Sequence, residues 1–379
     1  MASLAVKGLT RSYRGTAAVK DLDLHIDDGK FFTLLGPSGC GKTTTLNAIA
    51  GIIDVDEGDI IIGDRLVLSK RKKIFIEPKD RNIAMLFQEF SIYPNMRVRE
   101  SLALPLRAKK IEESAIKKRV EAVAKITGVD RLLDRRPSTL SGGEKRRAGL
   151  AKALVKKADI YLLDEPLTGC DAKMRVQLRG EIRRIHEELG GTIVNVTHDQ
   201  VEAMCMSDVI MLMNHGEKVQ VGSPDDLYYR PNCVFTAGFI GSPPMNLIDC
   251  SVGRVDGKLS FVRPEFEFPV PPRMASNLKK YADKEVVIGI RPDGLSVEGP
   301  TNNALQGYSL KAKISYVETS QPNLLIHAKC QDLEIVIESE DLKGRIGSET
   351  AVRVNPKKIH VFAKETGKVI VNALSTVGM

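Results

Sequence analysis

The stretch "GPSGCGKTTT", Gly36 to Thr45, decides the fold of the N-terminal half of the chain. It follows the apolar run "FFTLL", Phe31 to Leu35, and opens a helical pattern that runs to Gly51. A strand, a glycine-rich turn and a helix in this order form the context in which this pattern binds phosphate groups. Backbone N–H groups of the turn would surround the phosphates, Lys42 would reach the β- and γ-phosphate oxygens, and the Thr43 hydroxyl would bind magnesium. The predicted nucleotide contacts in this loop are Gly36, Pro37, Ser38, Gly39, Cys40, Gly41, Lys42, Thr43 and Thr44.

Three further apolar runs indicate buried strands of the same sheet. They are "NIAMLF" (Asn82 to Phe87), "IYLLD" (Ile160 to Asp164) and "TIVNVT" (Thr192 to Thr197). Strands with near-continuous apolar sequence are typical of a parallel sheet that is covered on both faces. Before the apolar run at Phe31 to Leu35, residues 4–26 alternate apolar and polar side chains, which predicts antiparallel strands with one face in water. The N-terminal half is therefore predicted to be α/β.

Polar side chains follow three of these strands, at the edge where open α/β sheets bind ligands. Asp164 is placed to hold the magnesium shell, and Glu165 to orient and deprotonate an attacking water. His198 is predicted to contact the γ-phosphate or that water, and the Gln88 amide to contact magnesium or water. These residues predict magnesium-dependent hydrolysis of a nucleoside triphosphate. The predicted catalytic residues are Glu165, His198 and Gln88, and the predicted metal ligands are Thr43, Gln88 and Asp164.

The stretch "LSGGEKRRAGLAKAL", Leu140 to Leu154, begins a helix with a serine and two glycines. Ser141 and Glu144 fit a capping box, in which each side chain bonds the other residue's backbone N–H. Gly142 and Gly143 cost backbone entropy without providing a side chain. They would also let an anion approach the helix N-terminus, whose free N–H groups attract negative charge. From these residues alone, a cap and an anion contact both remain open.

The chain changes character twice after the first strands. Between Gln88 and Pro137 the strand pattern disappears, and residues 112–128 carry apolar side chains at helical spacing before a glycine, which predicts a helical insertion. From about Pro243 onward, short strands alternate with Gly, Pro and Asp turns, which predicts a small all-β barrel or sandwich. The linker is predicted near "GSPPMN", Gly241 to Asn246.

Length and composition fit a globular protein with two domains. The chain has 379 residues, and no stretch approaches the roughly 18 apolar residues of a membrane span. The N-terminus lacks the pattern of a secretory signal, so we expect a cytoplasmic protein. Six scattered cysteines without metal-ligand spacing predict reduced thiols. The formal net charge of +8 suits an anionic partner, but runs such as Lys70 to Lys73 are typical of solvated faces.

The sequence resembles the ATP-binding cassette ATPases, the motor subunits of ABC transporters, over residues 1 to about 240. This resemblance implies a P-loop NTPase (RecA-like) core of the α/β class, with an antiparallel β subdomain and a helical subdomain at about residues 89–155. The segments that carry it, in the family's order, are "GPSGCGKTT", Gln88, "LSGGE", "LLDEP", Asp171 and His198.

The family resemblance also implies how two chains cooperate. Two cassettes would pair head to tail, so that Ser141 to Gly143 of one chain face the γ-phosphate held by Lys42 of the other. The anion at this helix N-terminus would then belong to the partner. Tyr13 would stack on adenine, and Asp171 would lie in the loop that crosses the dimer. The implied nucleotide contacts outside the phosphate loop are Tyr13, Ser141, Gly142, Gly143 and Asp171.

The C-terminal part resembles a narrower group. Residues 234–250, "VFTAGFIGSPPMNLIDC", and 286–297, "VVIGIRPDGLSV", resemble the junction and accessory β domain of importer ATPases of the maltose and glycerol-phosphate type. This implies an ABC ATPase domain over residues 1–240 and an oligonucleotide-fold-like (OB-like) regulatory domain over residues 241–379. The expected protein is the energy-coupling subunit of a solute importer, first of all for a sugar, with ATP and Mg²⁺ as cofactors. It would act as a homodimer on the inner face of the cell membrane, with two permease subunits and, indirectly, a solute-binding protein.

Other functions remain as alternatives. One is a soluble ABC-type ATPase that acts on nucleic acid or the ribosome through the barrel; another is an ABC subunit for iron or polyamine cargo. Aromatic residues make up only 5% of the chain and tryptophan is absent, which argues against a nucleic-acid platform, so no nucleic acid is expected. The basic segment at residues 70–81 has no assigned role, and we hypothesise that Lys70 to Lys73 lie near anionic lipid headgroups.

Overall fold

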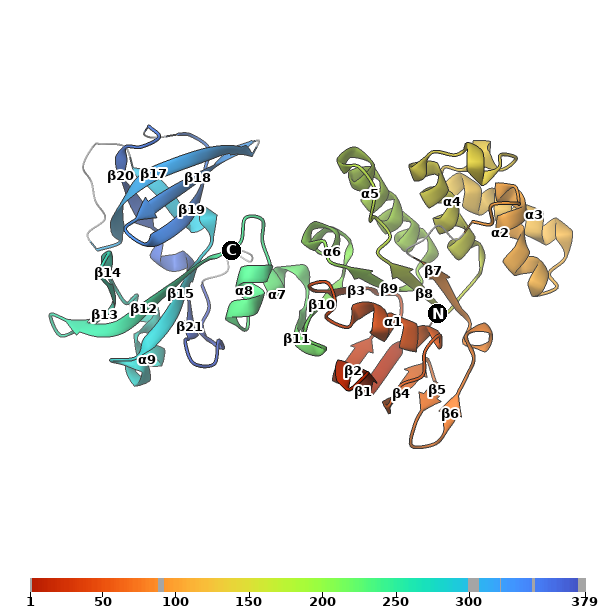
Figure 1. Ribbon diagram of the computed structural model, residues 1–379, viewed down its shortest axis with the longest axis horizontal. Coiled ribbons are helices and arrows are strands. Elements are labelled where there is room, and N and C mark those ends of the chain that lie inside the picture. Colours follow the sequence, from red (N-terminus) through yellow and green to blue (C-terminus); the bar gives the residue numbers. More distant parts are fainter. Residues whose placement is uncertain (1, 88–91, 299–306, 321, 343–344, 374–379) are drawn as a thin grey trace. The chain divides into compact units, whose positions relative to one another are not determined.

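The computed structural model describes residues 2–87, 92–298, 307–320, 322–342 and 345–373. The chain divides into two compact units, Met1–Pro224 (unit 1) and Asp225–Met379 (unit 2) (Figure 1). This division falls earlier than the boundary between residues 240 and 241 that the sequence suggests. The reason lies in unit 2, where the Arg291 guanidinium donates to the carbonyls of Tyr228 and Ile240. These bonds attach residues 225–240 to the strands that follow.

Unit 1 contains a six-stranded sheet in the order β11-β10-β3-β9-β8-β7, parallel except for β11. Its strands are β3 (Phe31–Leu35), β7 (Ile83–Leu86), β8 (Ile160–Asp164), β9 (Thr192–Thr197), β10 (Val209–Asn214) and β11 (Glu217–Gly222). A five-stranded antiparallel sheet has the order β2-β1-β4-β5-β6. Its strands are β1 (Leu4–Tyr13), β2 (Thr16–Ile26), β4 (Glu57–Ile62), β5 (Arg65–Ser69) and β6 (Ile74–Phe75). The expected α/β class is confirmed.

Side chains of the parallel strands alternate between two hydrophobic cores, because successive residues of a strand point to opposite faces. Phe31 and Leu163 pack with the helices on one face. Phe32 and Leu162 pack on the other face, against the antiparallel sheet and α1 (Lys42–Ala50). Every residue of β3, β8 and β9 is buried. The strand ends are thereby fixed, which makes their carboxyl edge a rigid base for a site.

The helices of unit 1 occupy the region where the strand pattern disappears and the segments between the last parallel strands. α2, α3 and α4 gather beside β7 and β8 (Figure 1), and their apolar side chains belong to one core. The α-helices of unit 1 after α1 are α2 (Val98–Ala108), α3 (Glu113–Ile126), α4 (Gly142–Val155), α5 (Ala172–Leu189) and α6 (Gln200–Met206). Short 3₁₀ helices cover Pro78–Asp80, Asp130–Leu132 and Pro137–Thr139.

The last residue of the basic segment at residues 70–81, Arg81, supports the C-terminal end of α1. Arg81 is 1% exposed, and its Nη1 donates to the carbonyls of Ala48 and Ile49, both at 2.8 Å. These carbonyls belong to the last turn of α1, where cations are favoured by the helix dipole. Gly51 ends the helix with φ 77°, and a Cβ there would lie 2.6 Å from the Arg81 guanidinium carbon. Lys70 pairs with Asp54 at 2.7 Å on the surface.

Unit 2 begins within α7 (Pro224–Tyr229), which is followed by α8 (Val234–Phe239) and two antiparallel sheets. The first has the order β14-β13-β12-β15-β21-β22: β12 (Asn246–Val255), β13 (Lys258–Arg263), β14 (Phe266–Pro269), β15 (Glu285–Ile290), β21 (Ile359–Ala363) and β22 (Val369–Val371). The second has the order β16-β20-β17-β18-β19: β16 (Leu295–Glu298), β17 (Ser309–Ser320), β18 (Asn323–Cys330), β19 (Leu333–Ser339) and β20 (Glu349–Val354).

Both sheets of unit 2 contribute to a single hydrophobic core. Phe261 and Ile288 come from the first sheet, and Ile326 and Val352 from the second. The short helix α9 (Pro272–Leu278) adds Met274 to this core. Three 3₁₀ helices, Lys279–Tyr281, Pro292–Gly294 and Pro356–Lys358, make the turns. The expected all-β C-terminal domain is therefore confirmed.

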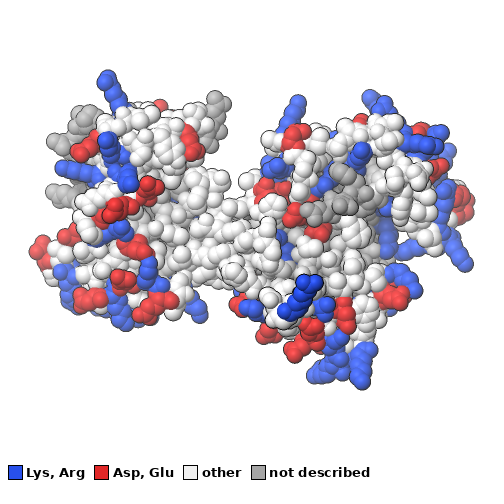
Figure 2. Space-filling model, viewed as in Figure 1, with Lys and Arg blue, Asp and Glu red and all other residues white. Residues whose placement is uncertain are grey.

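In the part of the chain that the structure describes, no helix is long and apolar enough to cross a membrane. Figure 2 shows Lys and Arg side chains spread over the visible face of each unit, with Asp and Glu side chains among them.

Candidate functional site

The phosphate loop lies between the end of β3 and the start of α1. Gly41 is the N-cap residue of α1 and has φ 101°, a conformation that residues with a side chain rarely adopt. A Cβ at Gly41 would lie 2.2 Å from the carbonyl oxygen of Ala18 in β2. The turn must therefore be made of glycine for two reasons, backbone conformation and close approach. Ser38 and Gly39 are exposed at its tip, whereas Cys40 is buried.

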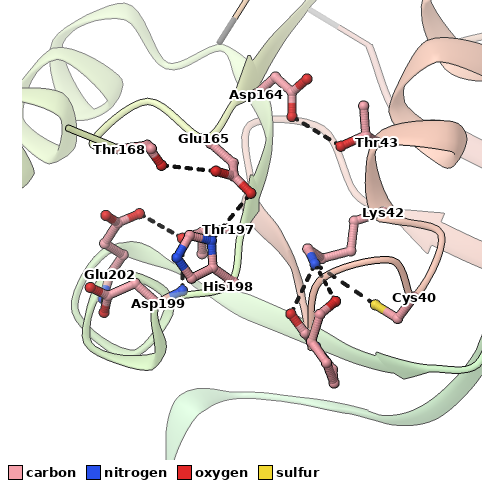
Figure 3. A network of polar contacts seen from close by, with 12 residues as sticks. Cys40, Lys42, Thr43, Asp164, Glu165, Thr168, Thr197, His198, Asp199 and Glu202 are labelled. Atoms are coloured by element: carbon pink, nitrogen blue, oxygen red, sulfur yellow. Dashed lines mark hydrogen bonds and ion pairs between the residues drawn. The ribbon is translucent and has the colours of Figure 1, made fainter.

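Lys42 crosses this loop. The residue is 5% exposed, and its Nζ donates to the carbonyls of Gly36 at 2.9 Å and Pro37 at 2.8 Å. Figure 3 shows the ammonium group among these carbonyls and the Cys40 sulfur, which lies 3.8 Å away. The positive charge is thus held at the mouth of the turn, on the same side as the strand ends.

Asp164 ends β8 beside the phosphate loop. The Thr43 hydroxyl donates to Asp164 Oδ1 at 3.4 Å, which brings a hydroxyl and a carboxylate together at the start of α1 (Figure 3). Burial is the largest cause that raises the pKa of Asp164, the charge of Glu165 adds to it, and the Thr43 hydrogen bond and Lys42 oppose it. A nearby cation would therefore be favourable for the ionised carboxylate.

Glu165 lies one residue beyond the strand and contacts His198. His198 Nδ1 is 3.2 Å from Glu165 Oε1, and the Thr168 hydroxyl donates to Glu165 Oε2 at 2.9 Å (Figure 3). Burial alone would raise the pKa of Glu165, but the hydrogen bonds from Thr168 and His198 outweigh it and lower the pKa. The carboxylate therefore stays ionised near neutral pH, as a group that accepts a proton must.

The backbone at Glu165 is supported by an arginine that the sequence analysis did not single out. Glu165 has φ 46°, in the left-handed region that is unfavourable for a residue with a Cβ. Arg146 of α4 is 6% exposed, and its guanidinium donates to the carbonyls of Glu165 and Pro166. Because the partners are nearly twenty residues apart in the chain, no local pattern identifies this contact.

A second polar network holds the loop of His198. The Thr197 hydroxyl donates to the buried carboxylate of Glu202 at 2.8 Å and accepts from the Asp199 N–H at 3.0 Å. Burial raises the pKa of Glu202. Figure 3 shows this network beside the Glu165–His198 contact. The residues flanking His198 are therefore tied to the first turn of α6.

The start of α4 has the predicted capping box. Ser141 Oγ accepts from the Glu144 N–H at 3.3 Å, and Glu144 Oε2 accepts from the Ser141 N–H at 2.8 Å. Gly142 has open space around it, and a Cβ at Gly143 would lie 2.2 Å from the Met174 methyl group. We call Ser141–Gly143 the tip of α4. Within the described residues, no hydrogen bond or ion pair joins this tip to the phosphate loop of its own chain.

Three other predicted residues lie in different surroundings. Asp171 is the N-cap of α5, and its Oδ1 accepts from the Met174 N–H at 2.9 Å, which places it beside the tip of α4. Tyr13 is 44% exposed at the end of β1 and pairs with Thr16 of β2, the strand that lies against the phosphate loop. Gln88 lies outside the described residues, so its predicted role stays a prediction.

Comparison with known proteins gives matches over both units. The family profile described as "ABC transporter" matches residues 19–168, and that of the "MalK OB fold domain" matches residues 241–295. The chain is 42% identical over 375 residues to the trehalose/maltose import ATP-binding protein MalK of Thermococcus litoralis, with 98% of this chain and 100% of the relative covered. It is 38% identical to the oligosaccharides import ATP-binding protein MsmX of Bacillus subtilis and to the sn-glycerol-3-phosphate import ATP-binding protein UgpC of Burkholderia cenocepacia. Both alignments cover 97% of this chain and 99% of the relative.

A solved structure agrees with these relatives. The ATP-binding cassette MJ0796, described as the dimeric structure of a post-hydrolysis state bound to ADP and Pi, is 29% identical and gives a TM-score of 0.51. The match covers 58% of this chain and 98% of that chain. The fold, the strand-edge residues and the full-length relatives agree. The chain therefore belongs to the ABC transporter family, as an ATP-binding import ATPase with a C-terminal OB fold domain of the MalK type.

Proposed function

We propose that this protein hydrolyses Mg²⁺-ATP to drive a membrane importer for a sugar or a glycerol-phosphate type of solute. The names of the relatives support this class of cargo, since they are trehalose/maltose, oligosaccharide and sn-glycerol-3-phosphate import proteins. The relatives do not favour the alternatives of a nucleic-acid or ribosome ATPase or an iron or polyamine subunit. In this proposal the protein binds two permease subunits on the inner face of the membrane and acts indirectly with a solute-binding protein.

One observation carries the catalytic part of the proposal. The ionised Glu165 carboxylate, bonded to His198 and Thr168, lies at the same strand edge as the Asp164–Thr43 pair and the phosphate loop. In this arrangement Lys42 and the loop bind the triphosphate, while Glu165 orients a water and accepts its proton as the water attacks the γ-phosphorus. His198 is the neighbour through which the position of Glu165 is set.

The donor set at Thr43 and Asp164 fits a magnesium ion. A hydroxyl and a carboxylate oxygen lie 3.4 Å apart, and hard oxygen ligands are those that Mg²⁺ prefers. Mg²⁺ usually keeps several waters and binds one or two protein oxygens together with phosphate oxygens. We propose Thr43 and Asp164 as its protein ligands and Gln88 as a further one. When bound, the ion would neutralise charge on the phosphate oxygens.

The test of the catalytic assignment is Glu165→Gln. The amide keeps the shape of the side chain but cannot accept the proton, so turnover should fall about a hundredfold. ATP should still bind, because the phosphate loop is unchanged. Turnover and nucleotide affinity are measured separately on the purified chain. Glu187→Gln, at an exposed acid of α5 that pairs with Arg183, is the control and should keep wild-type turnover. Near-normal turnover of Glu165→Gln would remove Glu165 from this role.

The pairing of two chains has a separate test. If the Ser141–Gly143 tip of one chain completes the site of the other, chains with Lys42→Ala and chains with Ser141→Arg should each be inactive alone. Mixed dimers should regain part of the activity, because one of their two composite sites carries neither substitution. The measurement is ATP turnover of mixtures in which mixed dimers are verified by two affinity tags. Absence of rescue in such dimers would contradict the shared site.

A further inference from the structure

The loop that ends at Asp171 and the segment after His198 are joined by one side chain, Arg175 of α5. Its Nη2 donates to the carbonyl of Cys170 at 3.2 Å, and its Nη1 donates to Asp199 Oδ2 at 3.3 Å. Both partners adjoin residues of the proposed site, since Cys170 precedes Asp171 and Asp199 follows His198. One planar guanidinium therefore bridges two segments that come from different strand ends.

Asp199 also makes hydrogen bonds to α6, so the bridge connects Arg175 firmly to that helix. Its Oδ1 accepts from the N–H groups of Val201 at 2.8 Å and Glu202 at 3.1 Å, and so caps α6. Its Oδ2 is left for Arg175. The carboxylate is thus rigidly attached to α6 on one side, and a displacement of Arg175 must act on the backbone next to His198.

The bridge does not have the properties of a stabilising ion pair. The side chains of Arg175 and Asp199 are 39% and 22% exposed, and pairs of this kind contribute little to stability. The Nε of Arg175 is buried and has no hydrogen-bond partner among the described residues. This contact therefore positions the two segments that it joins and adds little to the stability of the fold.

We infer that Arg175 is a positioning residue that transmits movement of the Cys170–Asp171 loop to His198, and thereby sets the Glu165–His198 contact in the hydrolytic site. The inference rests on the proposed function, in which Glu165 activates the water. In this inference, the Cys170–Asp171 loop and His198 are coupled by hydrogen bonds within one chain. Through this coupling, the state of the loop near the tip of α4 controls turnover without a contact, among the described residues, between Arg175 and the phosphate loop.

The same helix offers a matched control. Arg183 lies two turns further along α5, and its Nη1 donates to the carbonyl of Met206 at 3.0 Å and to Asp208 Oδ1 at 2.9 Å. It therefore makes the same kind of bridge, to one carbonyl and one aspartate, but at the C-terminal end of α6 and away from His198. Loss of either bridge removes one hydrogen bond to a carbonyl and one ion pair to an aspartate near an end of α6. Only loss of the first should affect the chemistry.

The experiment compares Arg175→Met, Arg175→Lys, Asp199→Asn and the double variant Arg175→Met/Asp199→Asn with Arg183→Met in the full chain. Asparagine at position 199 still caps α6 but lacks the charge that holds the arginine. ATP hydrolysis gives kcat and KM, and thermal unfolding gives stability. We expect Arg175→Met to lower kcat about tenfold with KM nearly unchanged. Arg175→Lys should recover part of the loss, and the double variant should be no slower than the slower single variant.

The outcomes separate the inference from the proposed function. If Arg175→Met lowers kcat no more than Arg183→Met does, or if the two single losses multiply in the double variant, the positioning role is wrong. If Arg175→Met raises KM while kcat stays the same, the residue acts on nucleotide binding and the inference is also wrong. Failure of the proposed function would show differently, as normal turnover in Glu165→Gln.

Discussion

Lys42 shows how a buried charge can be kept ready for a ligand. Its ammonium group is removed from water but donates to two carbonyls of the phosphate loop, at Gly36 and Pro37. A buried ammonium without such partners would be costly. The carbonyl dipoles satisfy the charge but do not neutralise it, so the loop still attracts an anion. The same lysine is therefore both a structural part of the turn and the proposed contact to the phosphates.

This dual role gives a prediction for Lys42→Ala. The substitution removes one charge-assisted hydrogen bond to the phosphates, so ATP affinity should fall about 10- to 100-fold. Titration calorimetry measures the affinity, and circular dichroism checks that the chain remains folded. Lys20→Ala, at an exposed lysine that pairs with Glu217, is the control and should bind ATP normally. Unchanged affinity of Lys42→Ala would mean that the phosphates bind elsewhere.

At the scale of elements, α1 depends on a residue that is distant in sequence. Arg81 provides the donors for the Ala48 and Ile49 carbonyls, and its Nε donates to the carbonyl of Ile76 at 2.7 Å. Burial lowers the pKa of Arg81 to about 10, so the guanidinium remains protonated at neutral pH. The positive charge at the C-terminal end of the helix is favourable for its dipole.

Arg81→Met should therefore destabilise unit 1 by about 2–4 kcal/mol, because it removes the side-chain donor of the Ile49 carbonyl, one of the two donors of the Ala48 carbonyl, and a buried side chain. Chemical denaturation monitored by circular dichroism gives the free energy of unfolding. Arg65→Met is the matched control: Arg65 also donates to a backbone carbonyl, that of Asp80, but at an exposed position. It should cost less than about 1 kcal/mol. Equal losses in the two variants would show that the contacts of Arg81 with the end of α1 are unimportant.

The sequence predicted the elements whose signals are local. The apolar runs at residues 31–35, 160–164 and 192–197 coincide with β3, β8 and β9, and the helix expected at residues 112–128 is α3. Residues 209–222, which form β10 and β11, were not identified as strands, although the run "VIMLMN" has the same apolar character.

For the site, the residues whose type and spacing a motif fixes are the ones that the structure brings together, and their roles stay predictions. Lys42, Thr43, Asp164, Glu165 and His198 meet at one strand edge because parallel strands bring their carboxyl ends together. The supporting arginines, at positions 81, 146 and 175, were not found. Each donates to at least one backbone carbonyl, which for the arginines at positions 81 and 146 is many residues away, and a carbonyl has no sequence signature.

At the scale of the molecule, the two units have separate cores and should respond separately to acid. His360 of unit 2 is 3% exposed, and its Nδ1 lies 3.2 Å from the Ala373 N–H. Burial, the largest cause, lowers the pKa of His360 from 6.5 to about 4. The folded unit keeps this imidazole neutral, whereas the unfolded chain protonates it near pH 6.5. The stability that the neutral His360 contributes is therefore fully present above pH 6.5 and is lost as the pH falls to about 4.

The expected loss for unit 2 over this range is about 3 kcal/mol from His360 alone. Calorimetry at a series of pH values should show the transition of unit 2 moving to lower temperature between pH 6.5 and 4. His360→Gln should flatten this dependence, whatever its effect on stability at pH 7. The transition of unit 1 in the same variant is the internal control and should match the wild type at each pH. A slope that persists in His360→Gln would show that other groups cause it.

The anchoring of α1 at both ends has a mechanical consequence. Its first residue, Lys42, is held by the carbonyls of the turn, and its last turn is clamped by a guanidinium from the β5–β6 side of the antiparallel sheet. A helix that is held at both ends resists sliding and tilting. A force that acts on a bound triphosphate would thus be transmitted through α1 to the antiparallel sheet. We therefore expect any movement that the nucleotide drives in unit 1 to arise outside the β3–α1 segment.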